Sequence, residues 1–437
     1  MRTPIRILLV VCIASFLFTT SFSQVFSPPQ NVAPNLGLSA GSPRVAFGVN
    51  GAAYLIWQDQ NMPDGKADFD IFFTRSNRNL TKLSPPRPLG SLPGNAYNNV
   101  IVTHGSAVYV AWEEFDPDLD REDVLFTASQ DEGATFGNPI SVNPAMPSSV
   151  TPQLATAPDG SVYILWADGR TGDIYLRASH DQGLTLGPMV NVSNDAEYSS
   201  EPQLAVDAAG MVHIAWTSQD TDVPVQGILY ANSPDGSTFI SPQNLSATLG
   251  GSYSPRIAIS GSFVYVAWKA DRIWLSRSSD RGLSFGSPQD ISFSVQYPSL
   301  AQIVAAAKNV YVLFTGYEPY YDKAFIARSN NQGGSFTVPF RLSDAWSENP
   351  HLSARGDRAD LIWSDRTTGN FEVRYTHTID GGRHWSRVQN VSKSSPDSTD
   401  PWIAAAPDGD VGVIWGENAE DIWGSVGRFA HPLSTNE

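Results

Sequence analysis

One segment of the sequence carries acidic residues at a spacing that suits metal binding. Asp116, Asp118 and Asp120 recur at every second position. Calcium takes six to eight oxygen ligands, and several carboxylates on one loop can supply them. The segment is not an EF-hand loop, because Arg121 and Thr127 stand where that motif needs glycine and glutamate. We therefore expect either a calcium site or a solvated acidic loop.

The rest of the sequence gives no further prediction of metal or nucleophilic chemistry. No group of histidines has zinc-ligand spacing, and no glycine-rich segment matches a phosphate-binding loop. One Gly-x-Ser-x-Gly match occurs, at 282–286, but no helical pattern follows it, so it does not predict the nucleophile elbow of serine hydrolases.

Aromatic residues form a second group with possible binding chemistry. Residues 317–322 read Tyr-Glu-Pro-Tyr-Tyr-Asp. Aromatic rings with a polar tip can stack on a sugar while the tip forms hydrogen bonds. Tyr317, Tyr320, Trp402 and His351 are therefore candidate ligand-binding residues. The alternative is that they serve ordinary loop packing.

A repeated turn indicates which elements position these residues. The pattern Ser-x-Asp-x-Gly-x-Thr/Ser-Phe begins clearly at Ser129 and Ser278, and at Ser179 with a leucine in the aromatic position. Altered copies begin at Ser233, Ser329 and Thr378, with a remnant at 76–80. A period of about fifty residues is typical of propellers and solenoids.

The repeat unit predicts a four-stranded antiparallel blade. Residues 152–193 contain three apolar or alternating runs separated by polar turns, and the repeated turn leads into a fourth run. Eight such units can be laid out along the chain, with first strands beginning near 43, 99, 152, 202, 255, 298, 350 and 401.

The two ends of the chain are expected to meet in one blade. The eighth unit has no fourth strand, and residues 26–32 resemble the fourth strand at 239–245. The sequence therefore predicts an all-β fold, a β-propeller of four-stranded antiparallel blades closed by the N-terminal strand. Eight blades follow from this pairing, and seven would be the better count if 26–32 does not pair with 421–429.

The repeated residues have structural explanations. In the turn, the aspartate can accept backbone hydrogen bonds, the glycine supplies a positive φ, and the aromatic residue packs between strands. Seven tryptophans end the second strands and are expected to pack between blades: Trp57, Trp112, Trp166, Trp216, Trp268, Trp363 and Trp415. A single active site does not need six copies of one turn.

The first residues predict export of the protein. Arg2 and Arg6 precede an apolar run over 7–18, which is too short to span a bilayer, and small residues end at Ser23. We expect residues 1–23 to be a signal peptide cleaved near Ser23, and 24–437 to be a single secreted or periplasmic domain. A lipoprotein signal ending at Cys12 is the alternative, although Val11 is too bulky for that motif.

The mature chain is expected to be strongly acidic. The formal charge of the whole sequence is −16, and removal of the two signal arginines takes it to −18. Such a surface repels nucleic acid and anionic lipid. We expect a monomer that neither spans a membrane nor binds nucleic acid.

The repeated turns resemble the Asp boxes, or bacterial neuraminidase repeats, of sialidase-like propellers. The resemblance covers nearly the whole mature chain, and these repeats also occur in glycan-binding proteins and sorting receptors. In such a blade the repeated turns follow the third strand and mark one rim of the propeller. A ligand site is expected on the opposite rim, where the least repeated loops lie.

The resemblance also implies catalytic residues to search for. Sialidases hold a substrate carboxylate with three arginines, attack with a tyrosine that a glutamate activates, and protonate with an aspartate. Arg44 and Arg256 follow prolines at the starts of innermost strands and are expected to face the channel, four blades apart. The remaining catalytic candidates are Tyr317, Glu318, Asp365 and Arg366.

We expect a secreted module that binds an extracellular glycan or protein. The alternative is a glycoside hydrolase of the exo-sialidase type, and a third possibility is a scaffold without a small ligand. Clustered carboxylates, or a tyrosine–glutamate pair beside several arginines, would favour the hydrolase.

Overall fold

The computed structural model describes most of the chain after residue 23. The described residues are 24–33, 39–61, 68–78, 80–90, 94–116, 120–144, 148–194, 197–219, 226–318 and 320–429. They form strands, turns and irregular segments, and no helix occurs among them. Accordingly, none of these residues belongs to a helix that is long and apolar enough to cross a membrane.

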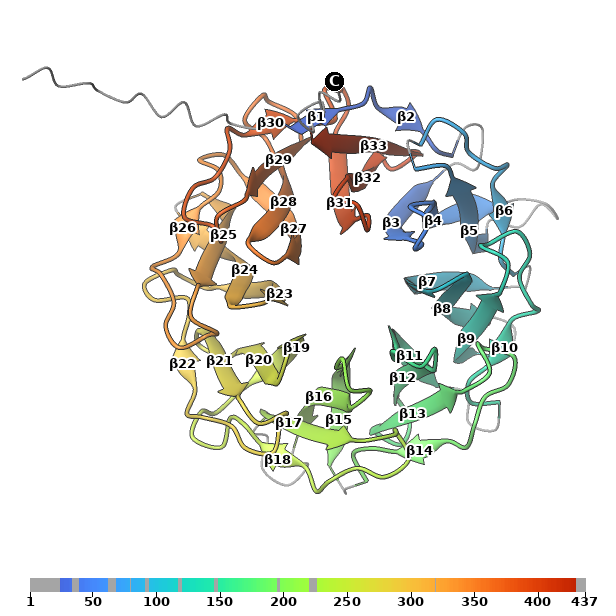
Figure 1. Cartoon of the computed structure of the whole chain (residues 1–437), viewed down its shortest axis with the longest axis vertical. Helices are drawn as coiled ribbons and strands as arrows, with labels where there is room; N and C mark the ends of the chain where they lie inside the picture. Colours follow the sequence, from blue (N-terminus) through green and yellow to red (C-terminus); the bar gives the residue numbers. More distant parts are fainter. Residues whose placement is uncertain are drawn as a thin grey trace, which may run out of the picture.

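The strands form a closed ring of eight antiparallel sheets around a central channel (Figure 1). The first four blades run from the innermost to the outermost strand as follows: β3 (Ala40–Phe47), β4 (Ala53–Asn61), β5 (Asp68–Ser76) and β6 (Arg87–Pro88); β7 (Asn95–His104), β8 (Ala107–Asp116), β9 (Arg121–Ser129) and β10 (Ile140–Ser141); β11 (Ser149–Thr156), β12 (Val162–Asp168), β13 (Asp173–Ser179) and β14 (Val190–Asn191); β15 (Tyr198–Val206), β16 (Val212–Gln219), β17 (Gln226–Ser233) and β18 (Gln243–Asn244).

The other four blades repeat this order. They are β19 (Tyr253–Ser260), β20 (Phe263–Lys269), β21 (Ile273–Ser278) and β22 (Gln289–Asp290); β23 (Ser299–Ala306), β24 (Asn309–Glu318), β25 (Tyr321–Ser329) and β26 (Phe340–Arg341); β27 (Ser347–Arg355), β28 (Arg358–Asp365), β29 (Glu372–Thr378) and β30 (Gln389–Asn390); and β31 (Ser398–Ala405), β32 (Val411–Glu417) and β33 (Asp421–Phe429).

The eighth blade is completed by the N-terminal segment. β1 (Gln24–Phe26) pairs with β33 in the register Val25 to Arg428, and β2 (Gln30–Asn31) pairs with the same strand. The predicted pairing, the ring closure and the count of eight blades are thus confirmed. The innermost strands keep one unpaired edge each, but these edges face the channel inside the closed ring.

Packing between blades holds the ring together. The seven tryptophans that end second strands are all buried, as predicted. Each hydrophobic cluster combines residues of neighbouring blades; one contains Trp216 with Leu176, and another contains Trp415 with Tyr375. The hydrophobic core of the described residues is therefore divided among the eight interfaces between neighbouring blades.

The repeated turn is a hydrogen-bonded clip, as its sequence predicts. The Asp131 carboxylate accepts hydrogen bonds from Ser129 Oγ at 2.7 Å, Thr135 N at 2.8 Å and Thr135 Oγ1 at 2.6 Å. Gly133 has a φ of 73°, and the site of its missing Cβ faces Phe73 of the previous blade. The turn therefore closes its own blade and also packs against the neighbouring blade.

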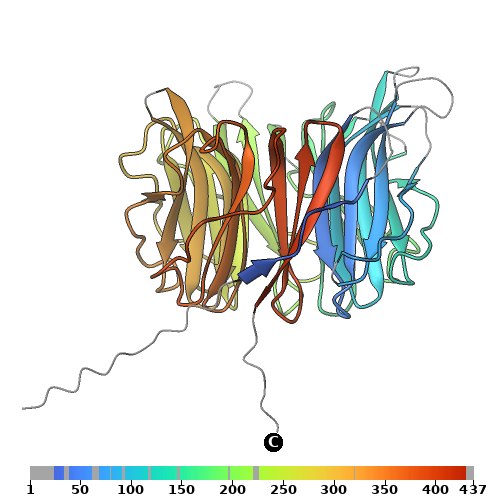
Figure 2. The ribbon, with the colours of Figure 1, turned by 90° about the horizontal axis from the view of Figure 1, so that it is seen from above.

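The repeated turns all lie on one rim of the ring. β33 is the third strand of its blade and ends at the lower rim in Figure 2, so the turns that follow third strands lie on this rim. The loops between second and third strands and the links between blades lie on the other rim, called here the variable rim.

Candidate functional site

The innermost strands line the channel, and each carries a register shift near its start. In six blades the shift has one form: a residue with positive φ, a proline, and then a residue that lines the channel. The positive-φ residues are Ser42, Thr151, Glu201, Ser254, Asn349 and Asp400. A bulge of this kind re-aims the side chain that follows it.

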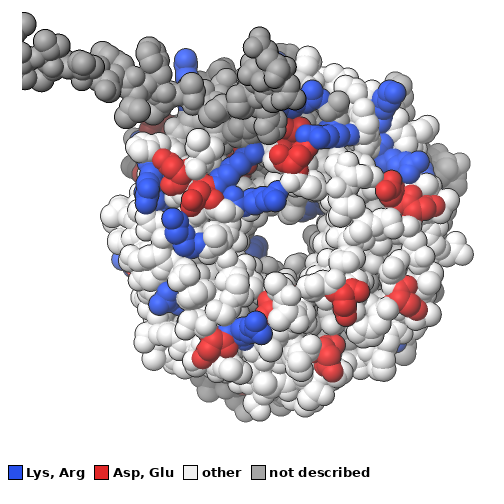
Figure 3. Space-filling view, viewed as in Figure 1, with Lys and Arg blue, Asp and Glu red and all other residues white. Residues whose placement is uncertain are grey.

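The residues after these prolines surround one cavity in the channel. Its volume is about 570 Å³, and its lining includes Arg44, Gln153, Gln203, Arg256, His351 and Trp402. The channel is open at the centre of the space-filling view (Figure 3). A cavity of this size suits a small ligand or a few sugar units.

Three of these side chains form a stack on one side of the cavity. The Arg44 guanidinium lies 4.1 Å from the ring centroid of Trp402. The His351 ring centroid lies 3.8 Å from that of Trp402. His351 Nδ1 is buried and has no hydrogen-bond partner among the described residues. Burial, followed by the nearby charge of Arg44, lowers the pKa of His351 to about 3, so its imidazole is neutral.

Arg256 lies in the fifth blade, opposite Arg44 in a ring of eight. Its Nε donates to the Ala301 carbonyl oxygen at 3.2 Å, and its Nη1 donates to the Pro255 carbonyl oxygen at 2.8 Å. Arg44 likewise donates to the Pro43 carbonyl oxygen at 2.9 Å. Each guanidinium is thus held by backbone oxygens, and the two line one cavity from opposite blades.

Neither arginine forms an ion pair with a carboxylate of the described residues. Burial lowers the pKa of Arg44 to about 10, against the opposing effect of Asp400. Burial also lowers the pKa of Arg256, against the effect of Glu201. Both groups remain charged at neutral pH. Two partly buried cations without a paired anion create a site that favours a negatively charged ligand.

The nearby carboxylates are engaged with neighbouring blades. Asp400 Oδ1 accepts a hydrogen bond from Asn349 Nδ2 at 2.8 Å. Glu201 accepts from Ser254 N at 2.8 Å, from Ser254 Oγ at 3.0 Å and from Thr217 Oγ1 at 2.9 Å. Asp400 is the only carboxylate among the described residues that line the cavity.

The tyrosine and glutamate candidates lie outside the channel cavity. Tyr317 and Glu318 end β24 and line a separate pocket of about 450 Å³ with Arg341. Glu318 is ion-paired with Arg341. Tyr320 is 82% exposed. The structure therefore does not bring Tyr317 and Glu318 together with Arg44 and Arg256.

Asp365 and Arg366 stand at the end of β28 and are also separate from the channel cavity. Asp365 is buried and accepts hydrogen bonds from Trp363 Nε1 at 2.9 Å and Arg374 Nε at 3.0 Å. The hydrogen bond from Trp363 is repeated in another blade, where Trp57 donates to Asp59 in the same way. Arg366 lies over the Phe371 ring at 4.5 Å and pairs with Asp397 at 3.3 Å.

The acidic segment is only partly described. Asp116 ends β8 and Asp120 has a φ of 48°, while Asp118 lies outside the described residues. Among the residues that the structure does describe, no group of three or more His, Cys, Asp or Glu side chains could hold a metal ion.

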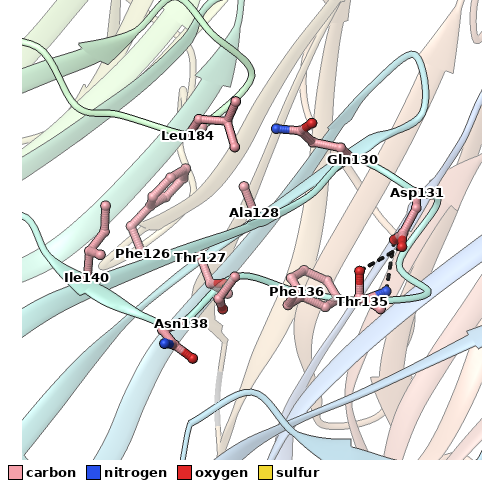
Figure 4. Close-up of a pocket in the computed structure, with 12 residues that line it drawn as sticks. Phe126, Thr127, Ala128, Gln130, Asp131, Thr135, Phe136, Asn138, Ile140 and Leu184 are labelled. Carbon is pink, nitrogen blue, oxygen red and sulfur yellow. Dashed lines mark hydrogen bonds between the residues drawn. The ribbon is translucent and has the colours of Figure 1, made fainter.

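A further cavity lies beside the repeated turn of the second blade. It has a volume of about 510 Å³ and lies between this turn and Leu184 of the next blade (Figure 4). The Asp131 carboxylate in its lining is already bonded to Thr135. Asp131 is the only charged residue in the described lining of this groove, which lies between two packed blades.

Several channel residues were not among the sequence candidates. Gln153, Gln203 and Gln302 present amide groups to the cavity, and Asn349 and Asp400 lie at its edge. The available signal was the repeated proline followed by a polar or aromatic residue at the start of the first strand. Whether that residue faces the channel depends on the bulge, and the alternating pattern of a regular strand does not predict a bulge.

Comparisons with known proteins identify the fold. No protein-family model matches the sequence, and no curated protein sequence is significantly similar to it. The structure resembles a polysaccharide lyase of family PL25, an ulvan lyase, with a TM-score of 0.52, 9% identity, and coverage of 92% of this chain and 95% of the lyase. It also matches a Dyadobacter fermentans protein of unknown function (TM-score 0.46, 13% identity, 93% and 99% covered) and the NanB sialidase of Streptococcus pneumoniae (TM-score 0.44, 10% identity, 93% and 94% covered). At such low identity, the likeness to the lyase shows a shared propeller fold.

Proposed function

We propose that this chain is a secreted Asp-box propeller that binds an acidic extracellular glycan in its axial channel. The observation that carries the proposal is the pair Arg44 and Arg256, which line one cavity without ion-pair partners among the described residues. A carboxylate or sulfate group on the ligand would supply the missing anion.

The other residues of the cavity lining suit a ligand whose negative charge is carried by a sugar. Trp402 lines the cavity and offers an aromatic surface, and Gln153 and Gln203 offer both hydrogen-bond donors and acceptors. A cavity of about 570 Å³ inside a ring of strands admits a chain of sugars more readily than a folded protein surface. The ulvan lyase of the same fold binds -[GlcA(1-4)Rha3S]-, which is an acidic glycan.

The arrangement favours binding over hydrolysis. A glycosidase of the exo-sialidase type needs its nucleophile, base and arginines in one site. Here Tyr317 and Glu318 line a different pocket from Arg44 and Arg256, and Asp400 is the only carboxylate of the described channel lining. The glycoside hydrolase is therefore the second hypothesis.

A glycan array combined with fluorogenic glycosides tests the proposal. We expect the purified mature chain to retain uronic-acid, sialic-acid or sulfated glycans and to release no fluorophore from sialosides, glucuronides or neutral glycosides. If the wild type releases fluorophore and Tyr317→Phe does not, the hydrolase hypothesis would replace the binding hypothesis. Absence of any acidic glycan among the retained ligands would contradict the proposal.

A further inference from the structure

The sixth blade departs from the repeat at the upper end of its second strand. Seven blades end the second strand with tryptophan, and in five of them an acidic residue follows two positions later; β24 has Phe314 and Gly316 instead. A Cβ on Gly316 would collide with Val295. The glycine thus allows the segment linking blades five and six to lie directly on β24, where Tyr317 N donates to the Gln296 carbonyl oxygen at 2.9 Å.

This local change creates a pocket at the outer edge of the blade. Its volume is about 450 Å³, and its lining joins Ser294 and Gln296 of the link to Tyr317 and Glu318 of β24 and Arg341 of the outermost strand, β26. The pocket lies on the variable rim, because β24 ends there. Its lining shares no residue with that of the channel cavity.

One tyrosine of the pocket lining, Tyr317, contacts a second exposed tyrosine, Tyr297, that lies beside the pocket. Tyr317 is 47% exposed and Tyr297 is 80% exposed, and their rings meet edge to face with centroids 6.5 Å apart. Contiguous exposed apolar surface is a feature of interaction sites. Such rings provide flat apolar surfaces on which the C–H face of a sugar can stack.

The charged groups of this pocket are mutually neutralised. Arg341 forms ion pairs with both Glu318 and Asp344. The guanidinium and the Glu318 carboxylate are each more than a third exposed, so hydrogen-bonding capacity remains on both sides of the pair. An anionic ligand would have to compete with two carboxylates for Arg341, whereas a pair of sugar hydroxyls can donate to Glu318 and accept from Arg341.

We propose that this pocket is a second glycan subsite, specific for a neutral sugar unit. Tyr317 is its stacking residue, and Glu318 and Arg341 bind its hydroxyl groups. The subsite does not depend on anion binding in the channel. It would let the propeller hold a neutral portion of a glycan, or a separate neutral glycan, on its variable rim.

Binding of neutral glycans to the full mature chain tests this subsite. We expect an array of neutral oligosaccharides, including galactosides, mannosides and glucosides, to contain retained members. Titration calorimetry with a retained member should show a loss of about tenfold in affinity for Tyr317→Ala and for Arg341→Met. Arg44→Gln, which alters only the channel, should bind the same neutral ligand as well as the wild type does.

Two results would overturn the subsite. One is that no neutral glycan is retained while the wild type is folded by circular dichroism. The other is that a neutral ligand binds equally to wild type, Tyr317→Ala and Arg341→Met. The proposed function of the channel is tested separately, because it depends on whether acidic glycans are retained.

Discussion

The guanidinium of Arg44 lies 4.1 Å from the ring centroid of Trp402, and this contact joins the first blade to the eighth. Both residues follow a proline at a strand bulge, and both line the channel. The stack exists only because the ring closes. The binding site and the closure of the propeller are therefore linked in one structure.

Closure predicts a stability effect at the N-terminus. Phe26 packs edge to face on Tyr375 at 4.7 Å in the cluster shared by blades seven and eight. Phe26→Ala should lower the free energy of unfolding by about 2 kcal/mol, measured by urea denaturation. Val25→Ala is the matched control, because Val25 is 64% exposed and should change little. Equal effects of the two variants would contradict this role of Phe26.

A second prediction concerns the glycine of the repeated turn. Gly282 has a φ of 81°, and a Cβ there would collide with the Tyr230 hydroxyl of the previous blade. Gly261 has a φ of 62° and open space around its Cβ position. Gly261→Ala should therefore lower the free energy of unfolding by about 1 kcal/mol, through backbone strain alone. In a denaturation experiment, Gly282→Ala should lower the free energy of unfolding by clearly more than Gly261→Ala does. A smaller loss for Gly282→Ala would contradict close packing of this turn against the previous blade.

The carboxylates of the turns predict a dependence on acidic pH. Hydrogen bonds from Ser278 and Ser284 lower the pKa of Asp280 to about 2. A depressed folded-state pKa stabilises the fold above the unfolded value of about 3.9, and this contribution is lost as the pH falls to about 2. Asp280→Ala should lower the melting temperature at pH 6, and the difference from wild type should shrink toward pH 2. A difference that stays constant with pH would exclude the ionised carboxylate as its cause.

Glu114 predicts the opposite dependence. Burial raises its pKa to about 7, against the effect of the hydrogen bond from Trp112. Because the folded-state pKa lies above the unfolded value, the stabilising contribution is complete below about pH 4 and is lost as the pH rises through about 7. Glu114→Gln should therefore raise the melting temperature at pH 8 by about 1 to 3 °C, with little effect at pH 4. The exposed Glu420→Gln is the control, and an equal shift in both variants would contradict the burial effect.

The sequence was sufficient to predict the architecture. Each blade repeats the same strand and turn chemistry, so the spacing from Ser129 to Ser179 predicts the period, and the likeness of 26–32 to 239–245 predicts the closure. These features depend on local pattern and on pairing between backbones, which a repeat displays many times.

The site was less predictable because it depends on side-chain direction. Placing Arg44 and Arg256 on innermost strands followed from the blade pattern. The stack of Arg44, Trp402 and His351 did not, because a bulge changes which face each following residue occupies. The pocket at Tyr317 was equally hidden, since it depends on the space that Gly316 leaves for Val295.

Calorimetric titration of acidic oligosaccharides tests the central claim most directly. Trigalacturonate and sialyllactose serve as acidic probes at 50 and 300 mM salt, and lactose, which carries no charge, measures any binding at the Tyr317 pocket alone. We predict that at least one acidic probe binds, that its affinity falls at high salt, and that it falls by about tenfold or more in both Arg44→Gln and Arg256→Gln. Failure of both acidic probes to bind, or binding that both variants retain unchanged, would contradict anion recognition in the channel.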